Sequence, residues 1–257
     1  MDLALTDLRV LVTGGSAGIG LATATLLAGE GARVAIASRH PEPAATSSGA
    51  AAIEADLSTA AGCDRAIEGA VSALGGLDVL VNNVGSAHIG RFADTDDEQW
   101  QRAWDTNVMS YVRCIRAALP QLQASAAASI VNVASTSGKR PSSGMPEYSV
   151  TKAAVLSLSR LVADVHAGDG IRCNAVCPGP TLSPAWLDPG GLADQTSGDS
   201  DRSRDEVLRA VGAGRPIGRM AEPDEIAAVI AFLCSPRSSY VTGAAWSADG
   251  GTVPVII

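Results

Sequence analysis

Short apolar runs alternate with longer segments of helical periodicity along nearly the whole chain, and this alternation limits the folds open to it. Strands that alternate with helices form βαβ units, whose strands lie parallel in one sheet with helices on both faces. The predicted fold class is therefore α/β, with a doubly wound parallel sheet flanked by helices. No stretch resembles a linker, so residues 1–257 are predicted to form a single domain.

Two stretches interrupt the pattern of strands and helices. Residues 41–49 are rich in Pro, Ala and Ser and are predicted to form a loop. Residues 190–205 are polar and longer than a usual connection, which is typical of either a surface insertion or a mobile lid. The expected strands cover 9–13, 33–38, 52–55, 78–82, 129–134, 171–176 and 244–248; the expected helices begin at Gly18 and after Pro223 and cover 59–74, 96–104, 108–122 and 147–166.

The composition excludes several classes of protein. Apolar residues make up 46% of the chain and charged residues 18%, which is not the composition of a disordered protein. The net charge of −8 argues against nucleic acid or an anionic membrane as a partner, and no apolar run is long enough to cross a bilayer. The five cysteines are odd in number and scattered, which predicts reduced thiols and a cytoplasmic location. None has a Cys or His partner at metal-ligand spacing, which predicts no metal site.

A glycine-rich turn follows the first predicted strand and leads into the first predicted helix. It reads TGGSAGIG at residues 13–20. Gly14 permits a tight turn, Gly18 lets the backbone approach a phosphate, and Gly20 lets the helix pack closely on the strand. The N–H groups and dipole at the helix N-terminus favour a pyrophosphate. The turn and its context therefore predict a Rossmann-type dinucleotide site.

The end of the second predicted strand bears on which dinucleotide is bound. An acid at this corner usually binds the ribose of NAD, whereas an arginine favours the 2′-phosphate of NADP. Here the corner is Ser38-Arg39, with no carboxylate, so we predict that NADP(H) is favoured over NAD(H). Asp56 follows the third predicted strand, where an acid can accept from the adenine amino group or stand at the start of the next helix.

Three polar side chains are expected to meet at the carboxyl edge of the sheet. Tyr148 and Lys152 lie four residues apart on a predicted helix, which places them on one face, one turn apart. Ser135 follows a predicted strand, as do the glycine-rich turn and Asn82-Asn83. Ligands of parallel sheets bind beyond the carboxyl ends of the strands, so these residues are predicted to share one crevice.

These motifs resemble the short-chain dehydrogenase/reductase family, and in particular its 3-oxoacyl-(acyl carrier protein) reductase-like members. The similarity covers nearly the whole chain, and so many motifs in the family's order make it specific. The matching segments are TGGSAGIG (13–20), ADL (55–57), NNVG (82–85), Asn107, Ser135, YSVTK (148–152), CNAVCPG (173–179), GRMAEPDEIA (218–227) and TGAAWSADGG (242–251).

The resemblance implies an enzyme with four catalytic residues. Tyr148 would be the general acid for carbonyl reduction or the base for alcohol oxidation, and Lys152 would lower the pKa of Tyr148 and hold the nicotinamide ribose. Ser135 would hydrogen-bond the substrate oxygen, and Asn107 would hold a water that connects Lys152 to solvent. The expected activity is NADP(H)-dependent interconversion of a carbonyl and a secondary alcohol by hydride transfer.

The resemblance also implies how the cofactor is held. Either Thr181 or Ser183 would bind the nicotinamide carboxamide, and the sequence leaves both open. Ala17 stands where many NADP-using relatives carry a basic residue, so an NAD-dependent alcohol dehydrogenase of the same family is one alternative; a cofactor-sensing protein without turnover is another. The expected cofactor contacts are Gly14, Ser16, Gly18, Ile19, Gly20, Ser38, Arg39, Asp56, Leu57, Asn82, Asn83, Gly85, Tyr148, Lys152, Pro178, Gly179, Thr181 and Ser183.

The expected partners are a small-molecule carbonyl or alcohol and further copies of the chain. Residues 182–209 are the candidate substrate lid, and Trp186, Leu187 and Met145 favour a partly apolar substrate. The resemblance implies a homo-oligomer, a tetramer or a dimer, in which the helices beginning at Val108 and Glu147 pair between subunits. The apolar end at residues 253–257 would fit burial at such a contact.

Overall fold

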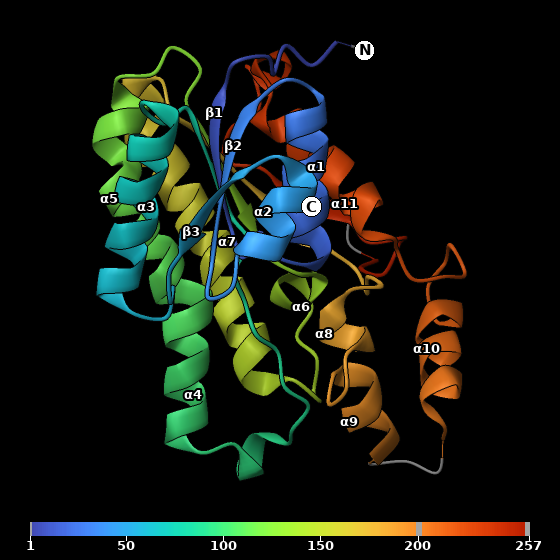
Figure 1. Cartoon of the computed structure of the whole chain (residues 1–257). Helices are drawn as coiled ribbons and strands as arrows, with labels where there is room; N and C mark the ends of the chain where they lie inside the picture. The colour runs from blue at the N-terminus through green and yellow to red at the C-terminus, as the bar shows by residue number, and fades with distance from the viewer. Residues whose placement is uncertain (1, 199–201, 255–257) are drawn as a thin grey trace.

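A single parallel sheet organises the molecule, in a computed structural model that describes residues 2–198 and 202–254. Its strand order is β3-β2-β1-β4-β5-β6-β7, and every neighbouring pair is parallel (Figure 1). The direction of winding reverses between β1 and β4, so the doubly wound α/β fold is confirmed. The strands are β1 (Arg9–Thr13), β2 (Arg33–Ser38), β3 (Ala51–Glu54), β4 (Val79–Asn82), β5 (Ser129–Val133), β6 (Arg172–Pro178) and β7 (Ala245–Ala248).

Helices cover both faces of this sheet. In Figure 1, α3 and α5 lie on one side, and α1, α2 and α11 lie on the other. The short helices α8, α9 and α10 stand apart from these layers, below the carboxyl edge of the strands. The helices are α1 (Gly18–Gly29), α2 (Glu42–Ser48), α3 (Ala60–Leu74), α4 (Asp97–Trp104), α5 (Ser110–Gln123), α6 (Thr136–Lys139), α7 (Pro146–His166), α8 (Pro184–Leu187), α9 (Leu192–Gly198), α10 (Arg204–Ala213) and α11 (Pro223–Cys234).

The apolar strands explain why the sheet is buried on both faces. Successive side chains of a strand point to opposite faces, so a strand between two helix layers must be apolar throughout. In β1, Leu11 joins the core formed with α3 and α5, whereas Val10 and Val12 join the core formed with α1 and α11. The five cysteines of the chain lie buried as free thiols, as expected.

The predicted loop at residues 41–49 is wrong, because this stretch contains α2. Gly49 ends the helix in the left-handed conformation, with a φ of 72°. Ala44 and Ala45 are buried in the core formed with α1, and the Ser48 hydroxyl donates to the carbonyl of Ala44 at 2.7 Å. The helix satisfies its own hydroxyls, so residues that favour turns in isolation are tolerated here.

Residues 190–205 contain more helix than their polar composition indicates. Residues 192–198 form α9 and α10 begins at Arg204, while residues 199–201 lie outside the described part of the chain. Ser203 caps α10 in a capping box with Glu206, a signal that was present in the sequence. The strands lie within two residues of their predicted bounds. No helix among the described residues is long and apolar enough to span a membrane.

Candidate active site

The turn between β1 and α1 has the geometry that a phosphate site requires. Gly14 and Gly18 have φ values of +62° and +52°, which favour glycine. A Cβ on Gly20 would lie 2.3 Å from the carbonyl oxygen of Gly14, so a larger residue there would displace the turn. Ala17 provides no side-chain cap to α1, and the first N–H groups of the helix can therefore bind an anion.

Asn82, the last residue of β4, and Asn83, which follows it, make different contacts. Asn83 braces the glycine-rich turn: its Nδ2 donates to the carbonyls of Thr13 at 3.2 Å and Gly14 at 3.0 Å. Asn82, predicted as a cofactor contact, instead points into the sheet and donates to Oδ1 of Asn132 at 2.9 Å. Asn82 lines neither of the cavities described below, and its side chain joins β4 to β5.

A cavity of about 480 Å³ lies beside the turn at the ends of β2 and β3, and we call it the Arg39 cavity. Its buried Ser38 hydroxyl has no hydrogen-bond partner among the described residues. Asp56 also lines it; hydrogen bonds from the Ser58 hydroxyl and N–H lower the pKa of this carboxyl. The expected contacts gathered here are Gly14, Ser16, Ser38, Arg39, Asp56, Leu57, Asn83 and Gly85.

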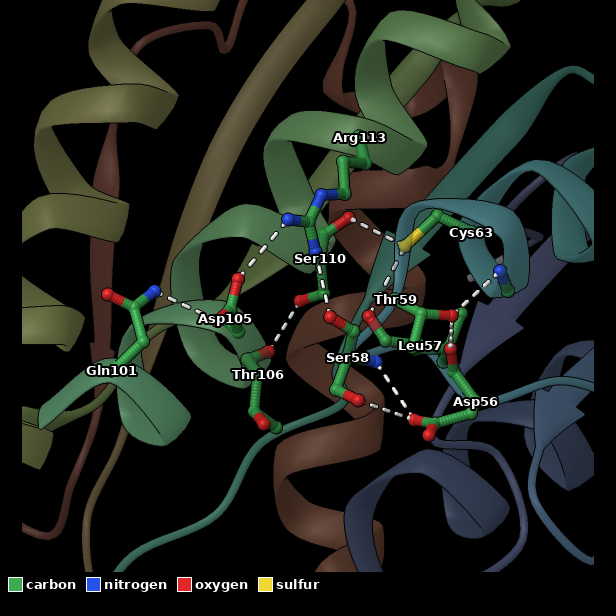
Figure 2. Close-up of polar contacts among 11 residues, drawn as sticks. Asp56, Leu57, Ser58, Thr59, Cys63, Gln101, Asp105, Thr106, Ser110 and Arg113 are labelled. Atoms are coloured by element: carbon green, nitrogen blue, oxygen red, sulfur yellow. Dashed lines mark hydrogen bonds and ion pairs between the residues drawn. The ribbon is translucent and has the colours of Figure 1, made fainter. Parts of the chain in front are cut away.

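The segment that carries Asp56 is held in place by a polar network (Figure 2). Arg113 of α5 donates to the carbonyl of Ser58 at 2.8 Å and to Oδ1 of Asp105 at 3.2 Å. Thr59, rather than Ser58 or Asp56, caps α3 by accepting from the N–H of Gly62. Asp56 is therefore not the helix cap, and its carboxylate stays at the rim of the Arg39 cavity.

A second cavity of about 290 Å³ lies beyond the ends of β4, β5 and β6, and we call it the Tyr148 cavity. Tyr148, Lys152 and Ser135 all line it, as the spacing of these residues predicts. The two cavities share Asn83, Gly85 and Ser86 in their linings, so one crevice runs from Arg39 to Tyr148. Ser135 is also the N-cap of α6, with its Oγ accepting from the N–H of Ser137 at 3.1 Å.

Burial dominates the electrostatics of the Tyr148 cavity. It lowers the pKa of Lys152 to about 7, because the ammonium is removed from water. It raises the pKa of Tyr148, and the hydrogen bond with Ser135 opposes this rise without cancelling it. The expected lowering of the Tyr148 pKa is thus absent from the cofactor-free protein. The Lys152 Nζ lies 5.7 Å from the centre of the Tyr148 ring, and it donates a hydrogen bond to the carbonyl of Val133 at 2.8 Å.

Asn107 lies in a π-helical turn, Asp105–Met109, between α4 and α5. Its Oδ1 accepts from the N–H of Ser86 at 2.9 Å, and its Nδ2 donates to the carbonyl of Ser86 at 3.0 Å and to Oγ1 of Thr151 at 3.1 Å. Both N–H donors of the side chain are engaged and Oδ1 keeps a second lone pair, so the side chain joins the segment after β4 to α7 and can still accept one more hydrogen bond. π-turns of this kind are frequent at functional sites.

Comparison with known proteins shows which family the chain belongs to. A family model described as enoyl-(acyl carrier protein) reductase matches residues 14–253. A solved structure described as a short chain dehydrogenase/reductase family protein is 35% identical over 99% of this chain and 100% of that chain, with a TM-score of 0.84. The chain belongs to the short-chain dehydrogenase/reductase family. The resemblance carried by the sequence motifs is therefore confirmed.

Other members of the short-chain dehydrogenase/reductase family indicate the reaction type. L-sorbose reductase from Gluconobacter frateurii, solved with NADPH and L-sorbose, is 34% identical, and all of both chains is covered, with a TM-score of 0.92. The 2-(S)-hydroxypropyl-CoM dehydrogenase 3 of Xanthobacter autotrophicus is 36% identical over 96% of each chain. The chain is thus an oxidoreductase of a family that uses NAD(P) and acts on alcohol and carbonyl groups.

The far end of the crevice contains both candidate residues for a short-chain dehydrogenase/reductase carboxamide contact. Pro178 ends β6 and Gly179 follows it, and both line the Tyr148 cavity together with Thr181 and Ser183. The buried Thr181 hydroxyl donates to the carbonyl of Gly179 at 3.0 Å. Ser183 precedes α8 without capping it by its side chain. Its hydroxyl is therefore the better placed of the two to bind a ligand.

One side of the Tyr148 cavity is formed by α8 and α9, which contribute Trp186 and Leu192. Gln195 of α9 accepts from the N–H of Ile89 at 2.9 Å through Oε1, and donates to the carbonyl of Gly190 at 2.8 Å. The helix is thereby tied to the segment after β4. Met145 also lines the cavity, as expected, whereas Leu187 does not.

One residue at the site was not predicted from the sequence. Tyr111 of α5 is buried, and its hydroxyl lies 3.5 Å from the Lys152 Nζ. The four-residue spacing from Asn107 could have indicated it, because residues one turn apart share a helix face.

Proposed function

We propose that the protein interconverts a carbonyl and a secondary alcohol with NADP(H), using Tyr148 as the general acid and base. The observation that carries this proposal is the single crevice that joins Tyr148, Ser135 and Lys152 to the Arg39 cavity. A binding site alone would not need a buried ammonium beside a phenol and a hydroxyl, because burying an ammonium lowers stability and groups with pKa values perturbed in this way cluster at functional sites.

Each polar group then has a defined task. In reduction, the Tyr148 hydroxyl gives its proton to the carbonyl oxygen, and in oxidation the phenolate takes the proton of the alcohol. The Ser135 hydroxyl hydrogen-bonds the same oxygen and orients it. The Lys152 ammonium stabilises the phenolate and holds the ribose hydroxyls next to the nicotinamide. When bound, the nicotinamide supplies or accepts the hydride.

The residues present fit a dinucleotide with a 2′-phosphate. The uncapped N-terminus of α1 suits the pyrophosphate, and the partnerless Ser38 hydroxyl and Arg39 suit the phosphate on the adenosine ribose. The carboxylate in the Arg39 cavity, Asp56, is engaged with Ser58. The alternative of an NAD-dependent enzyme rests on Ala17, where the turn carries no basic side chain.

Parallel titrations with NADPH and NADH, followed by fluorescence, test this cofactor assignment. Charge-assisted hydrogen bonds from Arg39 are worth roughly 1.5–3 kcal/mol, so Arg39→Ala should weaken NADPH binding by roughly 10- to 150-fold and leave NADH binding unchanged. Arg65→Ala, at an exposed position of α3, is the matched control. Equal loss for both cofactors, or no loss, contradicts the assignment.

Turnover distinguishes an enzyme from a cofactor sensor. Absorbance at the nicotinamide band across a carbonyl panel should show oxidation of NADPH, and Tyr148→Phe should abolish it while cofactor binding is retained. The sensor alternative predicts binding without turnover by either protein. Unchanged turnover in Tyr148→Phe would remove Tyr148 from its proposed role.

The cavity also favours a class of substrate. Among the described residues that line the Tyr148 cavity, Lys152 is the one with a charged side chain. A volume of about 290 Å³ is at the lower end for ligand sites, and the nicotinamide must share it. We therefore propose a small, uncharged and partly apolar substrate, in contact with Met145, Trp186 and Leu192. A carboxylate-bearing carbonyl that outcompetes a neutral one of equal size would contradict this.

We also propose that the chain assembles into a tetramer or a dimer. Val150, Leu161 and Val165 are exposed on one face of α7, the helix for which the family resemblance implies pairing between subunits. Of the apolar end, residues 255–257 lie outside the described part of the chain. Light scattering that shows only a 26.0 kDa species would refute the proposal.

A further inference from the structure

Lys152 is held by an arrangement that involves a second tyrosine. Its Nζ donates to the Val133 carbonyl at 2.8 Å and lies 3.5 Å from the Tyr111 hydroxyl. The Tyr111 hydroxyl donates to the same carbonyl at 3.0 Å. Because its proton is used there, the oxygen of Tyr111 presents its lone pairs to the ammonium. The Nζ also lies 5.3 Å from the centre of the Tyr111 ring, within range of a cation–π interaction.

Among residues 2–198 and 202–254, none near Lys152 carries a charge that could replace this contact. The titratable groups that face it are Tyr148 on α7, Tyr111 on α5 and Cys177 on β6. Burial raises the pKa of Cys177 to about 11 and that of Tyr111 well above its usual value, so both stay neutral near pH 7. No carboxylate among the described residues offsets the burial of the ammonium. Neutral acceptors must do so instead.

We propose that Tyr111 is a positioning residue for the reaction: its hydroxyl and ring, clamped to the Val133 carbonyl, hold Lys152 in place and keep its amine protonated. This inference rests on the proposed role of Lys152 at Tyr148. Tyr111 does not line the Tyr148 cavity, so it acts through Lys152 rather than on a substrate. The raised pKa of the Tyr111 hydroxyl means that it serves as a fixed dipole and not as a proton carrier.

The lysine composition of the chain permits a direct test. Lys139 and Lys152 are the two lysines of the sequence, so protein labelled with ¹³C at the lysine Cε gives two signals, and Lys139→Arg identifies which is Lys152. Titration of this signal in the cofactor-free protein measures the protonation of Lys152 without any turnover. We expect Tyr111→Phe to lower the Lys152 pKa by about half a unit to one unit, because one acceptor of the ammonium is lost. Tyr240→Phe makes the same change at a fully exposed tyrosine and should leave the titration unchanged.

A shift in the pH dependence of turnover is the second readout. A less protonated Lys152 stabilises the Tyr148 phenolate less, so the alkaline-rising limb of alcohol oxidation should move to higher pH in Tyr111→Phe. A purely structural role would reduce the amount of active enzyme without moving this limb. If Tyr111→Phe does not fold, 4-fluorophenylalanine at position 111 keeps the ring and fills most of the space of the hydroxyl. Its fluorine is a poor acceptor and cannot ionise, so it should also lower the Lys152 pKa.

The two readouts separate this inference from the proposed function. An unchanged Lys152 titration in a folded variant overturns the role of Tyr111, even if the wild-type protein reduces carbonyls. A lowered Lys152 pKa in a protein that turns over no substrate supports the placement of Lys152 by Tyr111 and refutes the proposed function instead.

Discussion

The buried ammonium of Lys152 should make the stability of the cofactor-free protein depend on pH in a defined direction. Folding lowers the pKa of Lys152 from 10.5 to about 7. Below pH 7 both the folded and the unfolded protein carry the charge, and the folded state bears the full cost of burying it. Between pH 7 and pH 10.5 Lys152 is neutral in the folded state but still charged in the unfolded state. The remaining cost is that of removing this proton on folding, and it falls to zero as the pH approaches 10.5. Lys152 thus lowers stability most at low pH.

Lys152→Met removes this cost. Relative to wild type, the variant should gain about 3 kcal/mol more in unfolding free energy at pH 6 than at pH 9. Urea unfolding of both proteins at the two pH values measures this difference, and effects of packing cancel because they are the same at both. Lys139→Met deletes the other lysine, which lies at the surface bonded to the Ala245 carbonyl, and should show a smaller difference. An equal gain for Lys152→Met at pH 6 and pH 9 would refute the reasoning.

Three further predictions concern single contacts. Hydrogen bonds from Arg9 and Ser125 together outweigh the effect of burial and lower the Asp78 pKa to about 2, so wild type should lose about 2 kcal/mol more unfolding free energy than Asp78→Asn between pH 4 and pH 2, measured by urea unfolding. Gly20→Ala should abolish cofactor binding measured by fluorescence, because its Cβ would meet the Gly14 carbonyl, whereas Gly29→Ala in the same helix meets nothing within 4 Å and should bind normally. We propose that α9 is part of a substrate lid, and Gln195→Ala removes its hydrogen bond to Ile89. This variant should raise KM for the carbonyl several-fold without changing NADPH affinity. Gln123→Ala is the surface control, and weaker NADPH binding by Gln195→Ala would contradict the lid.

The sequence predicted the sheet well because its strands are defined by strong local signals. Each strand is an apolar run bounded by turn residues, and the carboxyl edge then follows from the parallel order. The missed helices are short and stabilised by tertiary contacts. α2 depends on the burial of Ala44 and Ala45, which a composition of Pro, Ala and Ser does not reveal. α10, in contrast, has a capping box at Ser203 that could have been recognised.

The candidate site was predicted where chemistry depends on spacing and missed where it depends on packing. Tyr148 and Lys152 are four residues apart, and the structure places both side chains in the lining of one cavity, as this spacing predicts. Tyr111 was missed because an aromatic residue on a helix usually indicates core, and its polar role appears only once β5 lies beside α5. The orientation of the Asn82 side chain, towards Asn132 of β5, likewise depends on the pairing of β4 with β5, which the sequence does not reveal.

The end of β5 holds the proposed proton-transfer groups together, separately from the side of the cavity formed by α8 and α9. The Val133 carbonyl receives both Lys152 and Tyr111, and Ser135 follows two residues later. The relative positions of these groups are thus set by one strand at the centre of the sheet and by two helices packed on it, which are rigid elements. α8 and α9, which form one side of the cavity, belong to neither this strand nor these two helices. Substitutions there can change which carbonyl is bound while leaving the proton-transfer groups in register.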